Sequence, residues 1–449
     1  MAFPFDSSVV LPKFSVAGVI SRFQGVFEQL PDVRKASANR HYEVSDAALS
    51  AFGVFFTQSP SFLDYQQRMQ KKYGKSNAQS ILGIHQLPSM NQVRNLLDPV
   101  APEQMYPLIQ ELGDGLYQQG YLEEFRGLGG TLLLAMDGTD FFASEKIACA
   151  HCRCQTLQNG HTLYRHTAIT PVIVAPGQAA VVPLAPEFVQ PQDGTDKQDC
   201  ELAAAKRWLS AWGAHYAPWG ITLLGDDLYS HQPFCQQAIA QGYQLVLVCQ
   251  PDSHPLLYEW VADFERNGEL HTLQRQRRVG QQRFTEHYRY ANQLPLRDSD
   301  DALMLNWCEL TVTDAQAQVV YHNAWVTTHS ITDETVVAVA AAGRARWKVE
   351  NENNNVLKNQ GYHFDHNFGH GKQHLSNLLA TLIVLAYLLH TALEWLDQTY
   401  QCVRRLLPSR RTFFEHLRAL MQYVLFESWE QLMAFMLDGL DGKIPDTTQ

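Results

Sequence analysis

The sequence is poor in charge, and it contains neither a long uninterrupted apolar run nor a short repeat. Only 18% of its 449 residues are charged and 45% are hydrophobic, a composition that excludes a disordered or low-complexity chain. The lack of a fixed repeat or a sustained heptad pattern excludes solenoid and fibrous classes. The first residues show no basic stretch followed by an apolar one, so we expect no secretion signal.

The longest apolar stretch, Leu378–Leu389, is too short to span a bilayer, which takes about 20 residues. We therefore expect a buried core helix there and no membrane partner. Cysteine is also scarce, with eight residues in the chain. Without a secretion signal, these eight indicate free thiols, a reducing compartment and a cytoplasmic protein, nucleoid-associated if it binds DNA.

The chain has an excess of acidic residues, since 46 Asp and Glu face 35 Lys and Arg, for a net charge of −11. Such a balance weighs mildly against nucleic acid as a partner, although it leaves room for local basic surfaces. One such cluster places Arg68, Lys71, Lys72 and Lys75 on one face of an expected helix. These cations either form a solvated helix end or contact DNA phosphates.

Changes in sequence pattern divide the chain into five regions. We expect a helical, DNA-end-binding region at 1–125, the first part of a catalytic core at 126–250, and a β-rich insertion at 251–330. The rest of the core, with the helix that carries Glu350, follows at 331–395, and a helical region at 396–449 ends the chain.

The first core region predicts an α/β fold with the element order β-β-β-α-β-α-β. This order implies a mixed sheet, antiparallel through its first three strands and parallel afterwards. The expected strands are 131–136, 164–175, 179–184, 221–224 and 243–249, and the expected helices are 199–212 and 231–241.

Acidic residues follow two strands that should be neighbours in this sheet. Asp137 ends the first strand and Asp226 ends the fourth, so two carboxylates should meet at one edge. Carboxylates that close repel one another unless a cation lies between them, and oxygen ligands suit Mg²⁺ or Mn²⁺. Glu350 is the proposed third member, and Arg346 and Lys358 continue the polar face of its helix.

The segments Met136–Thr139, Gly225–Ser230 and Arg346–Glu350 resemble the three acidic motifs of DDE transposases from bacterial insertion sequences. The long gap before Glu350 matches the subgroup with a β-stranded insertion, and Gly361–Gly371 is also similar to a segment of such enzymes. The resemblance covers roughly residues 130–395. It implies an RNase H-like core that binds two divalent ions and transfers phosphoryl groups on DNA.

On this resemblance, Asp137, Asp226 and Glu350 hold the ions, while Arg346 and Lys358 hold phosphates. The enzyme would bind the inverted-repeat ends of its own element, cut there and join the ends to target DNA, with a homodimer in the active complex. The family's Tyr and Lys slots hold Gly343 and Leu357 here, so Lys358 is one position late. The alternatives are an RNase H-like endonuclease without strand transfer and a catalytically silent DNA-binding protein.

Two finer questions remain open in the sequence. Asp226 and Asp227 should point to opposite faces of the strand, and the family's motif spacing selects Asp226 as the ligand. Cys149 and Cys152 resemble half of a zinc site, with Cys154 close by and with His151, His161 and His166 near them, but a closed site needs four ligands. Either these are free thiols in a tight loop, which we favour, or they hold a structural zinc ion. His363, His366 and His370 either form a metal-binding cluster or pack against the core, and we favour packing.

Overall fold

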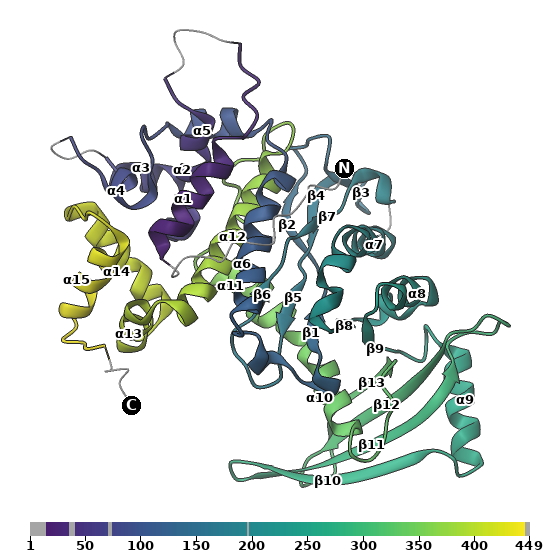
Figure 1. The fold of residues 1–449 in the computed structure, drawn as a ribbon. Coiled ribbons are helices and arrows are strands. Elements are labelled where there is room, and N and C mark those ends of the chain that lie inside the picture. The colour runs from purple at the N-terminus through teal and green to yellow at the C-terminus, as the bar shows by residue number, and fades with distance from the viewer. Residues whose placement is uncertain (1–14, 36–40, 71–73, 195–196, 445–449) are drawn as a thin grey trace.

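The computed structural model describes residues 15–35, 41–70, 74–194 and 197–444. These residues form a mixed α/β structure in which a large sheet extends from a helical body into a β-rich insertion (Figure 1). The predicted mixed α/β class with helical terminal regions is thereby confirmed.

The main sheet has nine strands in the order β10-β11-β12-β13-β9-β8-β1-β5-β6. Its central part runs parallel from β1 to β8 to β9, while β5 is antiparallel to β1 and β6 to β5. These directions agree with the sheet expected from the sequence. The central strands are β1 (Leu132–Ala135), β5 (Val172–Val174), β6 (Val182–Pro183), β8 (Ile221–Gly225) and β9 (Gln244–Val248).

Most residues of the central strands are apolar, and the surrounding elements bury both faces of these strands. Every residue of β1 and β8 is buried, which is typical of strands covered on both sides. The covering helices are α7 (Lys197–Tyr216), α8 (Gln232–Ala240), α10 (Val336–Ala345) and α12 (Leu375–Leu396).

The β-rich insertion continues the main sheet, because β13 pairs with β9 in antiparallel register. The sequence predicted a β-rich insertion but not its helix α9, and almost every side chain of its first strand, β10, is exposed. The insertion consists of α9 (Pro255–Arg266), β10 (His271–Val279), β11 (Gln282–Pro295), β12 (Met304–Thr313) and β13 (Val319–Thr327).

A second, four-stranded sheet was not expected. The predicted strand 164–175 is two strands in different sheets, since β4 ends at Ile169 and β5 begins at Val172. Pro171 between them has no N–H to donate to a ladder, which explains the break. The second sheet consists of β2 (Gly138–Ser144), β3 (Arg153–Thr156), β4 (Thr162–Ile169) and β7 (Glu187–Phe188).

The two helical ends of the chain pack together into one helical body, as the purple and yellow ribbons of Figure 1 show. Helix α12 packs on α2 and α6, and α14 packs on α3. The N-terminal helices are α1 (Val16–Phe27), α2 (Val44–Phe56), α3 (Phe62–Arg68), α4 (Asn77–Leu82), α5 (Met90–Leu97) and α6 (Tyr106–Gln118). The C-terminal helices after α12 are α13 (Gln398–Leu406), α14 (Arg410–Tyr423) and α15 (Trp429–Asp438).

Within the described ranges, α12 is the one helix long and apolar enough to cross a membrane. The most apolar stretch of this helix is completely buried inside the protein. It is therefore the central helix of the structure, as the sequence predicted for Leu378–Leu389.

Candidate metal-binding active site

Asp137 and Asp226 occupy equivalent positions on neighbouring parallel strands. Ala135 of β1 pairs with Leu224 of β8, and the Met136 N–H donates to the Leu224 carbonyl at 3.1 Å. Each aspartate lies two residues beyond its half of that pair. The register thus brings both carboxylates to the same edge of the sheet.

Burial raises the pKa of Asp137 to about 7. The positive charge of Arg346 acts in the opposite direction, while the negative charges of Glu350, Asp226 and Glu201 raise this pKa further. The carboxylate of Asp137 therefore lies within the field of three other carboxylates and one guanidinium. Burial among like charges is the condition under which a carboxylate gains most from a bound cation.

Asp226 and Asp227 have different surroundings, although they are adjacent in sequence. Burial raises the pKa of Asp226, Arg346 lowers it, and the charges of Asp227 and Glu350 raise it further. Asp227 instead accepts hydrogen bonds from the Gln250 N–H at 2.7 Å and from the Ser253 hydroxyl. Asp226 thus belongs to the carboxylate group, while Asp227 fastens the loop after β9.

Glu350 lies in a π-helical turn, η7 (Val349–Asn354), between α10 and α11 (Asn355–Asn359). The sequence predicted one continuous α-helix over these residues, whereas the structure has a wider, π-helical turn at this point. Glu350 Oε1 lies 3.0 Å from an Nη atom of Arg346, which is buried. Such turns recur at functional sites because they re-aim a side chain without ending the helix.

A hydrogen-bond chain joins the turn of Glu350 to the strand of Asp137. The Thr170 N–H donates to the Asp137 carbonyl at 3.0 Å, and the Thr170 hydroxyl donates to Asn354 Oδ1 at 2.8 Å. Asn353 also donates to Asn354 Oδ1, at 3.0 Å. The asparagines of this turn therefore hold it in place, which explains a run of poor helix formers at this point.

Sequence reasoning missed Glu201, a buried residue on α7 that is the fourth carboxylate near Asp137. Gly138 allows its approach, because a Cβ atom at this position would clash with the Glu201 carboxylate. Nothing in the local sequence around Glu201 marks it, since only the packing of α7 against the sheet brings it to Asp137.

An open cleft of about 580 Å³ lies beside the carboxylates. Asp226 and Arg346 form part of its wall, and the half-exposed indole of Trp347 also lines it. The site is therefore reachable from solvent on the side where Arg346 lies.

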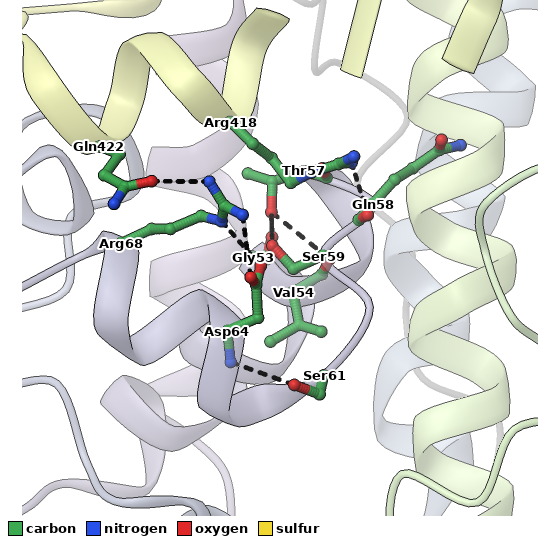
Figure 2. Close-up of polar contacts among 10 residues, drawn as sticks. All are labelled: Gly53, Val54, Thr57, Gln58, Ser59, Ser61, Asp64, Arg68, Arg418 and Gln422. Atoms are coloured by element: carbon green, nitrogen blue, oxygen red, sulfur yellow. Dashed lines mark hydrogen bonds and ion pairs between the residues drawn. The ribbon is translucent and has the colours of Figure 1, made fainter. Parts of the chain in front are cut away.

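The residues predicted to bind DNA occupy different settings. Arg346 lines the cleft, and Lys358 is half-buried on α11. Lys71 and Lys72 lie outside the described residues. The guanidinium of Arg68 pairs with Asp64 at 2.8 and 2.9 Å and donates to Gln422 of α14 at 2.8 Å (Figure 2). Its role in DNA binding stays a prediction, and its present contacts join α3 to α14.

A separate group of potential metal ligands lies in the second sheet. Cys149 and Cys152 meet His166 of β4 and His370, with one ligand atom from each residue within 4.8 Å of all the others. The sequence analysis identified both cysteines and noted His166 among the histidines near them, but it expected His370 to be a packing residue. Cys154, which was considered alongside them, is exposed and contributes no atom to this group.

No protein-family model matches the chain, and no curated protein is significantly similar to it. The chemistry of the two groups of residues therefore rests on their own geometry. The first offers four carboxylates and one guanidinium at the end of a parallel strand pair, an environment suited to hard divalent cations.

Proposed function

We propose that the protein is a DDE-type transposase, which cleaves DNA at the inverted-repeat ends of its own element and joins them to target DNA with divalent metal ions. The observation that carries this proposal is the convergence of Asp137, Asp226 and Glu350. These residues come from two adjacent strand ends and a distant helical turn, and the charges of Asp226 and Glu350 act on Asp137.

The strand order supports the finer proposal of an RNase H-like core. The series β6-β5-β1-β8-β9 has an antiparallel arm on one side of β1 and a parallel arm on the other. This arrangement matches the order that the sequence suggested for such a core. The insertion adds its strands beyond β9, at the edge farthest from β6.

The charges of the site fit divalent ions. Asp137, Asp226, Glu350 and Glu201 bring four potential negative charges, against one positive charge on Arg346. A Mg²⁺ or Mn²⁺ ion would neutralise this excess and favour the ionised form of Asp137. When bound, two such ions would activate an attacking hydroxyl and stabilise the leaving oxygen of a phosphodiester.

The chain's own groups would bind and orient the DNA. Arg346 lies between the carboxylates and the cleft, and its Nε has no hydrogen-bond partner among the residues that the structure describes. A guanidinium in this place suits a phosphate oxygen. Trp347, exposed on the same cleft, offers a face for a base or sugar.

The proposal includes DNA as both end and target substrate, a homodimeric active complex and a cytoplasmic location. None of the eight cysteines, all of which lie within the described ranges, forms a disulfide, which agrees with a reducing compartment. An RNase H-like endonuclease without strand transfer would use the same residues, so only the reaction products separate these two functions. The filled acidic positions argue against a silent DNA-binding protein.

The test uses labelled duplexes taken from the two sides of the chain's own coding sequence, a supercoiled plasmid target and Mg²⁺. We expect cleavage at a fixed position and labelled plasmid products. Glu350→Gln should reduce both reactions by about 10³-fold or more, because one ligand of a cooperating set is lost. Cleavage without labelled plasmid would establish the endonuclease and overturn the transposase.

Glu352→Gln is the matched control for Glu350→Gln. Glu352 lies in the same turn but pairs with Lys348 at 3.3 Å, away from the other carboxylates. It should retain activity within a few-fold of the wild type. Equal loss in both variants would mean that the turn, and not the Glu350 carboxylate, is what the reaction requires.

A further inference from the structure

Four side chains from three separate segments converge beside the second sheet. Cys149 and Cys152 come from the loop between β2 and β3, His166 from β4, and His370 from the loop between α11 and α12. Cys152, His166 and His370 are each at most 5% exposed. Four potential protein ligands, three of them buried and Cys149 half-buried, are the composition of a structural metal site and not of a catalytic one, which keeps a position for water.

The distances between the ligand atoms are those of a tetrahedron around zinc. Bonds of about 2.3 Å to sulfur and about 2.05 Å to nitrogen imply edges of about 3.8 Å for S–S, about 3.5 Å for S–N and about 3.3 Å for N–N. The two Sγ atoms are 3.8 Å apart, and the two Nε2 atoms are 3.2 Å apart. The Sγ–Nε2 distance is 3.4 Å from Cys149 to His166 and from Cys152 to both histidines.

The hydrogen bonds around the group also suit a metal. His370 Nδ1 lies 3.0 Å from the Gly371 carbonyl, which can only accept, so Nδ1 carries the proton and Nε2 presents a lone pair. The His151 N–H donates to Cys149 Sγ, and the Cys149 N–H donates to Cys152 Sγ, both at 3.4 Å. Donors to sulfur favour the thiolate form that binds metal.

The other common fate of two close cysteines does not fit this arrangement. A disulfide has its sulfur atoms about 2.05 Å apart, far less than the separation here. It would also leave the two buried imidazole nitrogens facing each other with no shared partner. A metal ion satisfies all four groups at once.

We propose that Cys149, Cys152, His166 and His370 bind one structural zinc ion. This ion fastens the loop after the Glu350 turn to the sheet that begins at Gly138, directly after Asp137. It is distinct from the carboxylate site in both position and chemistry, because sulfur and nitrogen ligands select Zn²⁺ where oxygen ligands select Mg²⁺. The inference therefore does not depend on the proposed transposase activity.

The experiment measures zinc in the full-length protein, purified without chelator, by elemental analysis. We expect about one zinc ion per chain. Cys152→Ser and His370→Ala should lower this ratio at least several-fold and make the β2–β3 loop more accessible to protease. Cys154→Ser and His161→Ala, on exposed residues of the same region, should retain the full ratio and the wild-type digestion pattern.

Cobalt substitution of the wild-type protein keeps the test decisive if the ligand variants fail to fold. Tetrahedral Co²⁺ with two thiolates should give intense visible absorption and a sulfur-to-cobalt charge-transfer band, which one equivalent of Zn²⁺ removes. A folded wild-type protein that contains no zinc and takes up neither metal would overturn the proposal. Zinc content unchanged by Asp226→Asn would separate this site from the carboxylates, whatever the outcome of the DNA assays.

Discussion

At the scale of single residues, the adjacent Asp226 and Asp227 have carboxylates with different surroundings. The charges of Arg346 and Glu350 act on Asp226, and the charge of Asp226 acts on Asp137. Asp227 turns toward the loop after β9, where Gln250 and Ser253 donate to it. The alternation of side chains at a strand end led us to expect different surroundings for these two residues, but it could not identify the partners of Asp227, and Asp226 as the ligand stays a prediction.

We predict that Asp226→Asn abolishes high-affinity Mn²⁺ binding, because it removes one ionised ligand from the group. Asp227→Asn should retain the Mn²⁺ affinity within a few-fold. It should lower the free energy of unfolding by about 1–2 kcal/mol, because the loop after β9 would lose a charged hydrogen-bond acceptor. Isothermal titration with Mn²⁺ and urea unfolding measure the two effects. The opposite pattern would place the ligand at Asp227.

The residues that sequence reasoning missed were all brought in by long-range packing. Glu201 precedes Asp226 on a different element, and His370 lies more than 200 positions after Cys152. Short-range spacing identifies a strand end or a Cys-x-x-Cys pair. It cannot state which distant side chain completes the set.

At the scale of elements, helix α10 shows why one position departs from the pattern of DDE transposases, which the sequence resembles. Gly343 stands where that pattern has a tyrosine, and a Cβ there would clash with the indole of Trp325 on β13. The insertion thus packs where a larger side chain would stand. A helix pattern in the sequence could not reveal this contact, because it depends on the continuation of the main sheet into the insertion.

Helix α12 carries His390 completely buried among the helices of both chain ends. His390 Nε2 donates to the Phe56 carbonyl at 3.0 Å, so Nδ1 accepts from the Tyr362 hydroxyl at 2.7 Å. Burial lowers the pKa of His390 well below its usual value, and the charges of Arg410 and Arg404 lower it further, against the opposing effect of the Phe56 carbonyl. The folded protein therefore holds this ring neutral.

We predict that His390 makes the protein less stable as the pH falls below about 6.5. The unfolded chain binds a proton at this residue near pH 6.5, while the folded chain does not until a much lower pH. Stability is thus lost on acidification by up to about 1.4 kcal/mol per pH unit. Urea unfolding between pH 5 and 8 measures the slope.

His390→Gln isolates this contribution, since it removes the titrating ring and keeps a donor in the same place. Its unfolding free energy should depend less steeply on pH than that of the wild type over this range. His416→Gln, at an exposed position of α14, reports the effect of removing a histidine from the surface. An unchanged slope in His390→Gln would assign the acid sensitivity to other groups.

At the scale of the whole molecule, sequence patterns predicted the central sheet well and the relation of the chain ends poorly. Strands β1, β8 and β9 are apolar runs of four or five residues bounded by turns, and a run of this length favours a strand over a buried helix. Strand β2 was missed because its first residues, Gly138 and Thr139, follow Asp137 in an Asp-Gly-Thr sequence that is also typical of a turn. The sequence analysis treated the two helical ends as separate regions. An amphipathic pattern shows which face of a helix is buried, but it does not show which other helix covers that face.

The packing of the two ends rests on a few contacts that tie α2 to the C-terminal helices. Arg418 of α14 donates to the Thr57 and Gln58 carbonyls at 3.2 and 2.7 Å, where α2 ends (Figure 2). The Phe56 ring lies 5.1 Å from the indole of Trp429 on α15, which is 2% exposed. Each end therefore supplies part of the other's core, so the two should unfold together.

We predict that Trp429→Ala lowers the free energy of unfolding by about 3–5 kcal/mol, the usual effect of emptying a large buried aromatic site. Hydrogen exchange should show loss of protection in α2 as well as in α14 and α15, because their shared core is damaged. Trp260→Ala, at an indole 42% exposed on α9, is the matched control and should leave these helices protected. If Trp429→Ala exposed α15 alone, the N-terminal helices would be a unit that is stable without the C-terminal ones.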